Sequence, residues 1–320
     1  MIKTPKIKTN NKINAAGSER RLRYQSKISC HIKKIPKGTQ KSAGVYTHKT
    51  FPTSRQNTAQ LNITMSMLTP KPLSILIISD LHLAPEYPEI NALFDMFLKK
   101  IAPSTEQLYI LGDLFNYYLG DDAISDFQKT TAEKLKNLSL THDIKIKILP
   151  GNRDVFLGQK FCELAHGALL PEVFTEDFTP PDSNHHSFKI LYCHGDQLCT
   201  SDKKYQYYRK LIHLPWVRNL FLSLPIKFRE KIALNIRKSS RRKFEKAQTY
   251  VDVEFNTAQE FAKKYEAKIL IHGHTHHWVD QPEPPYLKRR IVNTDWKENS
   301  ASYIQIDKSG MIEIKKFSPI

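Results

Sequence analysis

Cysteine is scarce: the chain has four in 320 residues, Cys30, Cys162, Cys193 and Cys199, with no CxxC pair. This low density excludes a disulfide scaffold and favours a reducing, cytoplasmic compartment. Long apolar runs are also missing, since none approaches the roughly 20 residues that a membrane-spanning helix needs. The start of the chain lacks the apolar segment of a secretory signal.

Acidic residues are nearly absent from the first fifth of the chain. Residues 1–65 hold 14 Lys or Arg against one acid, Glu19, and so carry most of the net charge of +17. Because they also lack apolar periodicity, we expect residues 1–68 to form a basic disordered extension. Two interpretations stay open: a tail that binds nucleic acid or anionic lipid, or a dispensable extension ahead of a start at Met65 or Met67.

Five short apolar runs predict buried strands of the kind found in a sheet covered on both faces. They are residues 73–79, 108–111, 144–149, 188–193 and 268–271. Helical periodicity at residues 89–101 and 123–138 separates the first three strands. Residues 290–292, 301–306 and 311–317 predict antiparallel strands that close the sheet.

Residues 201–262 differ in composition from the rest of the folded part, which we assign to residues 73–200 and 263–318. Residues 203–246 carry 14 Lys or Arg against two acids, and Trp216, Val217, Leu220, Phe221 and Leu224 follow helical spacing. We predict a helical cap insertion over the active edge of the sheet. Its apolar stripe either packs into the core or lines a groove for apolar substrate.

Each of the five strands ends in residues that can bind metal. In chain order they are Asp80 and His82, Asp113, Asn152, His194, and His274 with His276. Ligands bind at the carboxyl ends of strands in such sheets. Carboxylate, imidazole and amide groups without thiolate suit Mn²⁺ or Fe²⁺ better than a structural zinc site. Cys193 precedes His194 directly, so it is expected to face the opposite side of the strand.

Seven candidate ligands exceed what a single ion needs, which predicts two ions that share a bridging ligand. Paired ions about 3.5–4 Å apart hold both the attacking and the leaving oxygen of a phosphoryl transfer. The alternative for any one of these residues is a purely structural role. The five blocks together, each directly after an apolar strand, favour the catalytic interpretation.

The ordered motifs DLH, GDLF, GNRD, HGD and GHTH resemble the calcineurin-like metallophosphoesterase superfamily. Within it, residues 112–122, 151–158, 194–200 and 270–276 are similar to the UDP-2,3-diacylglucosamine pyrophosphohydrolases of lipid A biosynthesis in Gram-negative bacteria. The resemblance covers residues 74–318. It implies an α/β fold, a ββ-sandwich flanked by helices in α/β/β/α layers, with a helical cap insertion.

The resemblance also implies the chemistry: a metal-activated hydroxide attacks the α-phosphorus and releases UMP and 2,3-diacylglucosamine 1-phosphate (lipid X). It implies two Mn²⁺ ions, the first held by Asp80, His82, Asp113 and His276 and the second by Asp113, Asn152, His194 and His274. Asp113, Asn152, Arg153 and His194 would be the catalytic group. Asn152, Arg153, Asp202, Ser240, Lys243, Lys246 and His274 would contact substrate, with Ser239 as the alternative to Ser240.

The sequence departs from the family pattern at Ser201, His277-Trp278 and Asn116, and none of these positions is a predicted ligand. The motif ending Gly120-Asp121-Asp122 supports the resemblance but has no evident physical role. The basic cap suggests peripheral association with the anionic cytoplasmic face of the inner membrane. The alternatives are a metallophosphodiesterase or nucleotide pyrophosphatase with a soluble substrate, and a binding scaffold whose tail contacts nucleic acid.

Overall fold

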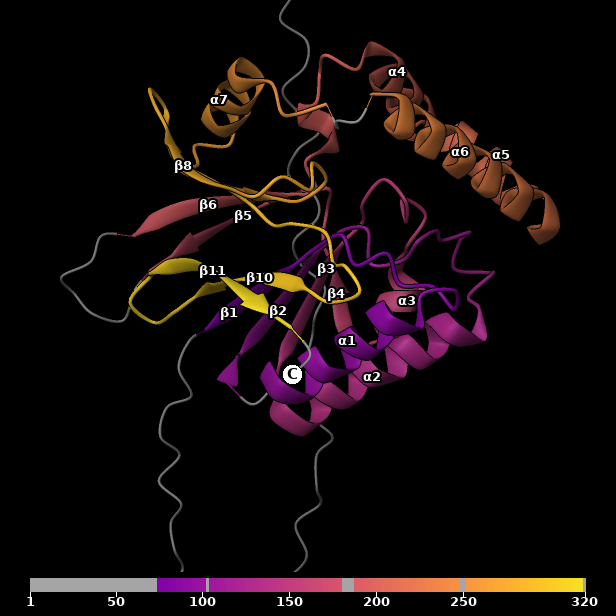
Figure 1. Cartoon of the computed structure of the whole chain (residues 1–320), viewed down its shortest axis with the longest axis horizontal. Coiled ribbons are helices and arrows are strands. Elements are labelled where there is room, and N and C mark those ends of the chain that lie inside the picture. Colours follow the sequence, from indigo (N-terminus) through magenta and orange to yellow (C-terminus); the bar gives the residue numbers. More distant parts are fainter. Residues whose placement is uncertain (1–73, 102–103, 180–186, 248–250, 319–320) are drawn as a thin grey trace, which may run out of the picture. The chain divides into compact units, whose positions relative to one another are not determined.

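Two β-sheets stacked face to face form the centre of the folded part (Figure 1). The computed structural model describes residues 74–101, 104–179, 187–247 and 251–318. These residues belong to one compact unit, Thr64–Ile320. The predicted basic extension, residues 1–68, lies outside the described residues.

The first sheet has six strands in the order β11-β10-β1-β2-β3-β4. Their bounds are β1 Ile75–Ile78, β2 Gln107–Leu111, β3 Lys145–Leu149, β4 Gly167–Leu169, β10 Ala301–Ile306 and β11 Ile312–Phe317. Strands β1 to β4 are parallel, whereas β10 pairs antiparallel with β1 and with β11. The carboxyl ends of β1, β2 and β3 therefore meet at one edge of this sheet.

The second sheet has five strands in the order β5-β6-β7-β9-β8. Their bounds are β5 Val173–Phe178, β6 Phe188–Cys193, β7 Ile269–His272, β8 Val279–Glu283 and β9 Leu287–Val292. Strands β6, β7 and β9 are parallel, and β5 and β8 pair antiparallel at the two edges. This sheet delivers His194 and the residues after β7 to the same region as the first sheet.

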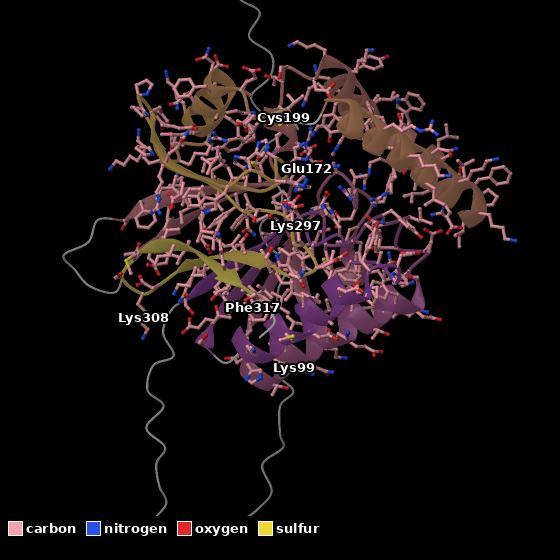
Figure 2. The ribbon with its side chains drawn as sticks, in the orientation of Figure 1. Lys99, Glu172, Cys199, Lys297, Lys308 and Phe317 are labelled. Carbon is pink, nitrogen blue, oxygen red and sulfur yellow. The ribbon has the colours of Figure 1, made fainter. Side chains whose placement is uncertain are left out.

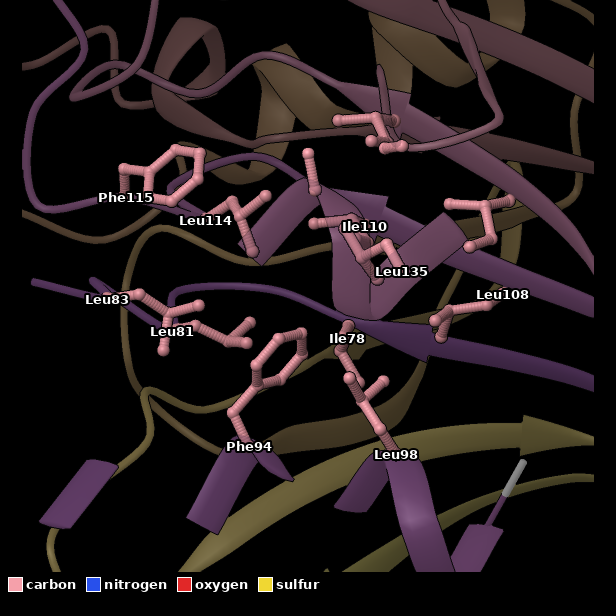
Figure 3. Close-up of a cluster of buried hydrophobic side chains, with 14 of the residues drawn as sticks. Ile78, Leu81, Leu83, Phe94, Leu98, Leu108, Ile110, Leu114, Phe115 and Leu135 are labelled. Atoms are coloured by element: carbon pink, nitrogen blue, oxygen red, sulfur yellow. The ribbon is translucent and has the colours of Figure 1, made fainter. Parts of the chain in front are cut away.

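Alternation along the strands explains the layers. In β1, Ile75 and Ile77 face the core between the sheets, while Leu76 and Ile78 face the helices. The helices on that side are α1 (Pro88–Ile101), α2 (Asp126–His142) and α3 (Gln159–Leu164). Figure 3 shows Ile78, Leu108 and Ile110 packed with side chains such as Phe94, and Figure 2 places Phe317 beside α1, where its ring contacts Phe97.

The outer face of the second sheet is covered by α7 (Phe255–Lys264). Ala258 and Ala262 of this helix are buried against Cys193, which faces away from the side of His194, as predicted. The layers are thus helix, sheet, sheet, helix, in agreement with the predicted fold class. The predicted cap boundary at residue 262 falls inside α7, so α7 belongs with the sandwich rather than with the cap.

Three helices lie at the edge where the strands end: α4 (Lys203–Ile212), α5 (Pro215–Ser223) and α6 (Ile226–Ala247). Phe221 of α5 stacks on Phe156 at 4.4 Å between ring centroids and packs against the main core. Trp216 and Leu220 remain 62% and 57% exposed. Core packing therefore accounts for only part of the apolar stripe of α5.

One topological prediction is wrong. Residues 290–292 belong to β9, which lies in the second sheet and runs parallel to β7, instead of closing a single sheet as an antiparallel strand. The antiparallel partner of β9 is β8, a strand of mostly polar residues that the apolar pattern does not reveal. The predictions for residues 301–306 and 311–317 are confirmed by β10 and β11.

Candidate metal centre

Two overlapping groups of side chains at the strand ends could hold metal ions. Asp80, His82 and His276 form one group, and Asp80, Asp113 and His194 form the other; within each group the ligand atoms lie within 4.8 Å of one another. The groups combine residues from both sheets, because Asp80, His82 and Asp113 follow β1 and β2, whereas His194 and His276 follow β6 and β7. The sandwich thus brings together side chains that are far apart in sequence.

Asn152 and His274 complete this arrangement. The side-chain oxygen of Asn152 lies 2.9 Å from Nε2 of His194 and 2.8 Å from Nδ1 of His274. His194 in turn contacts the carbonyl of Leu111 at 2.9 Å through Nδ1, leaving Nε2 toward Asp113 Oδ1 at 3.5 Å. All seven predicted ligands are therefore placed in one cluster, and their roles toward metal stay a prediction.

The backbone around the cluster is strained. Asp80, His82, Asp113, His274 and His276 all have positive φ, between 54° and 68°. Such left-handed conformations are uncommon for residues other than glycine, and they concentrate at functional sites. Two hydrogen bonds hold this conformation between the β1 and β2 loops: Asp80 N–H to Gly112 O at 3.2 Å, and His82 N–H to Asp113 O at 2.9 Å.

The donor atoms of the cluster fit divalent cations. Both ring nitrogens of His82 are buried without a hydrogen-bond partner among the described residues, which is unusual for buried polar atoms. Asp80 and Asp113 are 0% and 1% exposed and repel each other. Buried carboxylates in contact with imidazoles, without thiolate, match the donor preferences of Mn²⁺ and similar ions.

The histidines of the cluster have pKa values that are shifted in opposite directions. Burial, reinforced by Arg153, holds the pKa of His82 well below its usual value, and burial with His194 lowers the pKa of His274 to about 3. Burial would also lower the pKa of His194, but Asp113 and Asp80 outweigh it and raise that pKa to about 9. His82 and His274 are thus neutral near pH 7, the state in which imidazole binds metal.

Two arginines face this cluster. Arg153 contacts Asp113 through Nε at 3.3 Å and the side-chain oxygen of Asn116 at 3.2 Å. Arg237 of α6 donates to the backbone carbonyl of Asn116. Burial and the charge of Arg153 lower the pKa of Arg237 to about 10. Sequence reasoning missed Arg237, because it is one of 14 basic residues between positions 203 and 246.

The other predicted substrate contacts lie on the cap helices. Asp202 is the N-cap of α4 and accepts a hydrogen bond from the Tyr205 N–H. Ser239 and Ser240 are both exposed on α6, so their positions do not select one of them. The side chains of Lys243 and Lys246 lie outside the described residues.

A chain of polar contacts joins α4 to the residues after β6. Arg209 pairs with Asp196 at 2.7 Å and with Glu172 at 2.6 Å, and Glu172, which Figure 2 labels, directly precedes β5 of the second sheet. Tyr205 donates to Asp196 at 2.6 Å, and its ring stacks on His274. Burial would raise the pKa of Asp196, but His194 and Arg209 outweigh it and lower it to about 2. The start of the cap is therefore tied directly to the loops of the candidate metal centre.

Removal and return of divalent metal should change thermal stability. Mn²⁺ should raise the melting temperature of chelator-treated protein, because a cation relieves the repulsion between Asp80 and Asp113. Ligand at 100 times its Kd stabilises the folded state by about 2.7 kcal/mol. Differential scanning fluorimetry with and without Mn²⁺ measures the shift. The same shift in Asp113→Ala would contradict the assignment of this site.

The fold and the strand-end cluster are those expected of a metallophosphoesterase, and comparison with known families agrees. Residues 73–278 match the calcineurin-like phosphoesterase family, and the chain belongs to this family. Phosphoesterases are hydrolases, so the chain is an enzyme of this class.

Comparison with individual proteins is more specific than the family match. The chain is 39% identical over 234 residues to the UDP-2,3-diacylglucosamine hydrolase of Haemophilus influenzae (strain PittGG), which covers 73% of this chain and 94% of that protein. It is 40% identical over 230 residues to the protein of the same name from Actinobacillus succinogenes, covering 72% and 94%. For the one from Neisseria meningitidis serogroup A the identity is 37% over 237 residues, covering 73% and 95%.

Proposed function

We propose that this protein hydrolyses the pyrophosphate bond of UDP-2,3-diacylglucosamine, giving UMP and 2,3-diacylglucosamine 1-phosphate, a step of lipid A biosynthesis. The observation that carries the proposal is the strand-end cluster of seven potential ligands. It occurs in a chain that aligns with almost the full length of relatives named UDP-2,3-diacylglucosamine hydrolase. The test is release of UMP from this substrate by the purified protein.

Two Mn²⁺ ions are proposed at the cluster. Asp80, His82, Asp113 and His276 would hold the first, and Asp113, Asn152, His194 and His274 the second, so that Asp113 is shared. Bound ions would supply Lewis acidity at the pyrophosphate and lower the pKa of an attacking water. The position of Asp113 supports its central role, since its two carboxylate oxygens face His194 and His82 at 3.5 and 3.7 Å.

Arg153 and Arg237 are proposed to bind the pyrophosphate. Two half-buried guanidinium groups that repel each other are stabilised when an anion lies between them, and a guanidinium donates two parallel hydrogen bonds to phosphate oxygens. They come from different elements, the loop after β3 and helix α6, and share Asn116 as a hydrogen-bond acceptor. This arrangement would orient the scissile bond toward the carboxylates and histidines.

Arg237→Ala should lower kcat/KM for UDP-2,3-diacylglucosamine roughly 10- to 100-fold, as expected for the loss of one hydrogen bond to a charged group. The loss should be largely in KM if Arg237 binds the ground state. UMP release gives both constants. Lys238→Ala, at an exposed neighbouring position on α6, is the matched control and should stay close to wild type. Equal kcat/KM values for the two variants would contradict the placement of Arg237 at the pyrophosphate.

The cap is proposed to bind the acyl chains and to associate with the anionic cytoplasmic face of the inner membrane. Large apolar side chains on α5 and α6 are exposed, among them Trp216, Leu220 and Phe228 at 57–62%. Lys227 and Lys231 are exposed on the same helix as Phe228. Exposed aromatic and aliphatic groups next to basic residues suit the surface of an anionic lipid layer. No described helix is long and apolar enough to cross a membrane.

Membrane association of this kind should depend on salt. Each basic residue near an anionic surface contributes about 1 kcal/mol, and this attraction is screened at high ionic strength. Protein sedimenting with phosphatidylglycerol-containing vesicles at low salt should therefore be released at high salt. Protein that stays bound in high salt, or that never binds, would contradict electrostatic peripheral association.

A further inference from the structure

The motif Gly120-Asp121-Asp122 lies where the loop that begins at Asp113 meets the cap. Asp121 faces the sandwich: its carboxylate accepts hydrogen bonds from the N–H groups of Gly158 and Lys160 at 3.1 and 2.8 Å. It also accepts one from the Tyr118 hydroxyl at 2.7 Å. Asp121 therefore ties this loop to the start of α3.

Asp122 points to the cap and pairs with Arg229 of α6. Nη1 of Arg229 donates to Asp122 Oδ1 at 2.8 Å, and Nη2 contacts the second carboxylate oxygen. Nη1 also reaches the Leu119 carbonyl at 2.8 Å, and Nε donates to the Leu224 carbonyl at 2.9 Å. Among residues of α6 whose burial is described, Arg229 is the only buried one, at 3% exposed.

Gly120 allows this contact. Its φ is +122°, and a Cβ at this position would lie 2.6 Å from Leu222 and 3.1 Å from Arg229. The pairing with Arg229 also lowers the pKa of Asp122. The left-handed backbone favours glycine here, and an added Cβ would also push against the side chains of Leu222 and Arg229.

The same loop meets α6 a second time, nearer the metal centre. Arg237 lies eight residues after Arg229, about 12 Å along the helix at 1.5 Å per residue. It contacts Asn116, which lies between Asp113 and Asp122 on the loop. Helix α6 therefore contacts this loop through two arginines: Arg237 beside the candidate metal centre, and Arg229 at the far end of the loop.

We propose that Asp122 and Arg229 are positioning residues that fix α6 on the loop beginning at Asp113 and thereby place Arg237 at the pyrophosphate site. This inference rests on the proposed function, because it assigns Arg237 a substrate contact. Bidentate pairing between a guanidinium and a carboxylate fixes orientation as well as distance. A pair that only stabilises the fold would not act through Arg237.

A double-mutant cycle separates these roles. Asp122→Asn should lower kcat/KM for UDP-2,3-diacylglucosamine roughly tenfold in the wild-type background, mostly through KM, and less than about twofold in an Arg237→Ala background. Arg229→Lys, which keeps the charge but loses the bidentate geometry, should behave like Asp122→Asn. Asp126→Asn is the control, since its side chain is 98% exposed and, among the described residues, pairs with Lys129 alone.

Losses that multiply in the double variant, or an Asp122→Asn enzyme with wild-type kinetics, would overturn the proposal. Hydrogen exchange gives a second readout that needs no substrate. Asp122→Asn should speed amide exchange in α6 while the exchange of β1 and β2 and the Mn²⁺ affinity stay unchanged. If wild-type protein releases no UMP, the proposed function fails, whereas unchanged exchange in α6 of the variant overturns the positioning role itself.

Discussion

Asp113→Ala is expected to reduce pyrophosphate hydrolysis by about 10³-fold or more, the scale seen when a central catalytic group is removed. Asp113 is 1% exposed, and its carboxylate faces His194, His82 and Arg153 within 3.3–3.7 Å. It also accepts a hydrogen bond from the Arg153 N–H at 2.8 Å. Its removal therefore affects both proposed metal positions and the orientation of Arg153. Steady-state UMP release measures the loss.

The variant must remain folded for this result to be informative. Loss of this carboxylate relieves repulsion with Asp80 but also leaves His194 and Arg153 without a counter-charge, so the folding of the chelator-treated variant is checked by its thermal unfolding curve. Asp126→Ala, an exposed carboxylate in the following helix, should keep full activity. Turnover by Asp113→Ala within tenfold of wild type would contradict the shared-ligand role.

Gly112→Ala is expected to cost both stability and activity. The φ of Gly112 is +83°, and an added Cβ would lie 2.5 Å from Gly151 Cα and 2.8 Å from His194 Nδ1. Left-handed strain costs about 1–3 kcal/mol, and the contact with Gly151 is backbone, which cannot rotate away. Either the β2 and β3 loops separate or His194 moves. Denaturant unfolding should show a loss of at least about 2 kcal/mol.

Gly167→Ala provides the comparison for this variant. Gly167 lies in β4 of the same sheet, and its added Cβ would lie 3.2 Å from the nearest atom, the Ile146 carbonyl oxygen. We expect a much smaller change in stability and little change in activity. If Gly112→Ala is as stable and as active as Gly167→Ala, the close approach of the two loops does not matter to the site.

The strand ends could be read from the sequence because each follows an apolar run directly. Leu108 to Leu111 leads into Gly112 and Asp113, and Phe188 to Cys193 leads into His194. Period-two alternation also placed Cys193 on the outer face. Each of these inferences depends only on residues that are adjacent in the sequence, so it can be made without knowing the tertiary fold.

The cap contacts could not be read in the same way. Arg229 meets Asp122 across 107 residues, and Arg237 meets Asn116 across 121. Both arginines lie in a strongly basic helix, where nothing local distinguishes the buried guanidinium from its exposed neighbours. The prediction that residues 290–292 close the sheet as an antiparallel strand failed for a related reason, because pairing partners are set by the tertiary fold.

The structure also gives the acidic end of the motif at residues 112–122 a physical role. Asp121 holds the start of α3 and Asp122 holds α6, so adjacent carboxylates connect the loop from Asp113 to two different parts of the protein. A pattern of two successive acids alone does not show that they face opposite ways. The loop of the candidate metal centre is thereby supported from both the sandwich and the cap.

The most direct test is to incubate purified, chelator-treated protein with UDP-2,3-diacylglucosamine, with and without Mn²⁺, and to identify the products. We predict Mn²⁺-dependent release of UMP together with 2,3-diacylglucosamine 1-phosphate. Absence of UMP in the presence of Mn²⁺, with hydrolysis of a soluble phosphodiester by the same preparation, would contradict the proposed substrate and leave a phosphodiesterase.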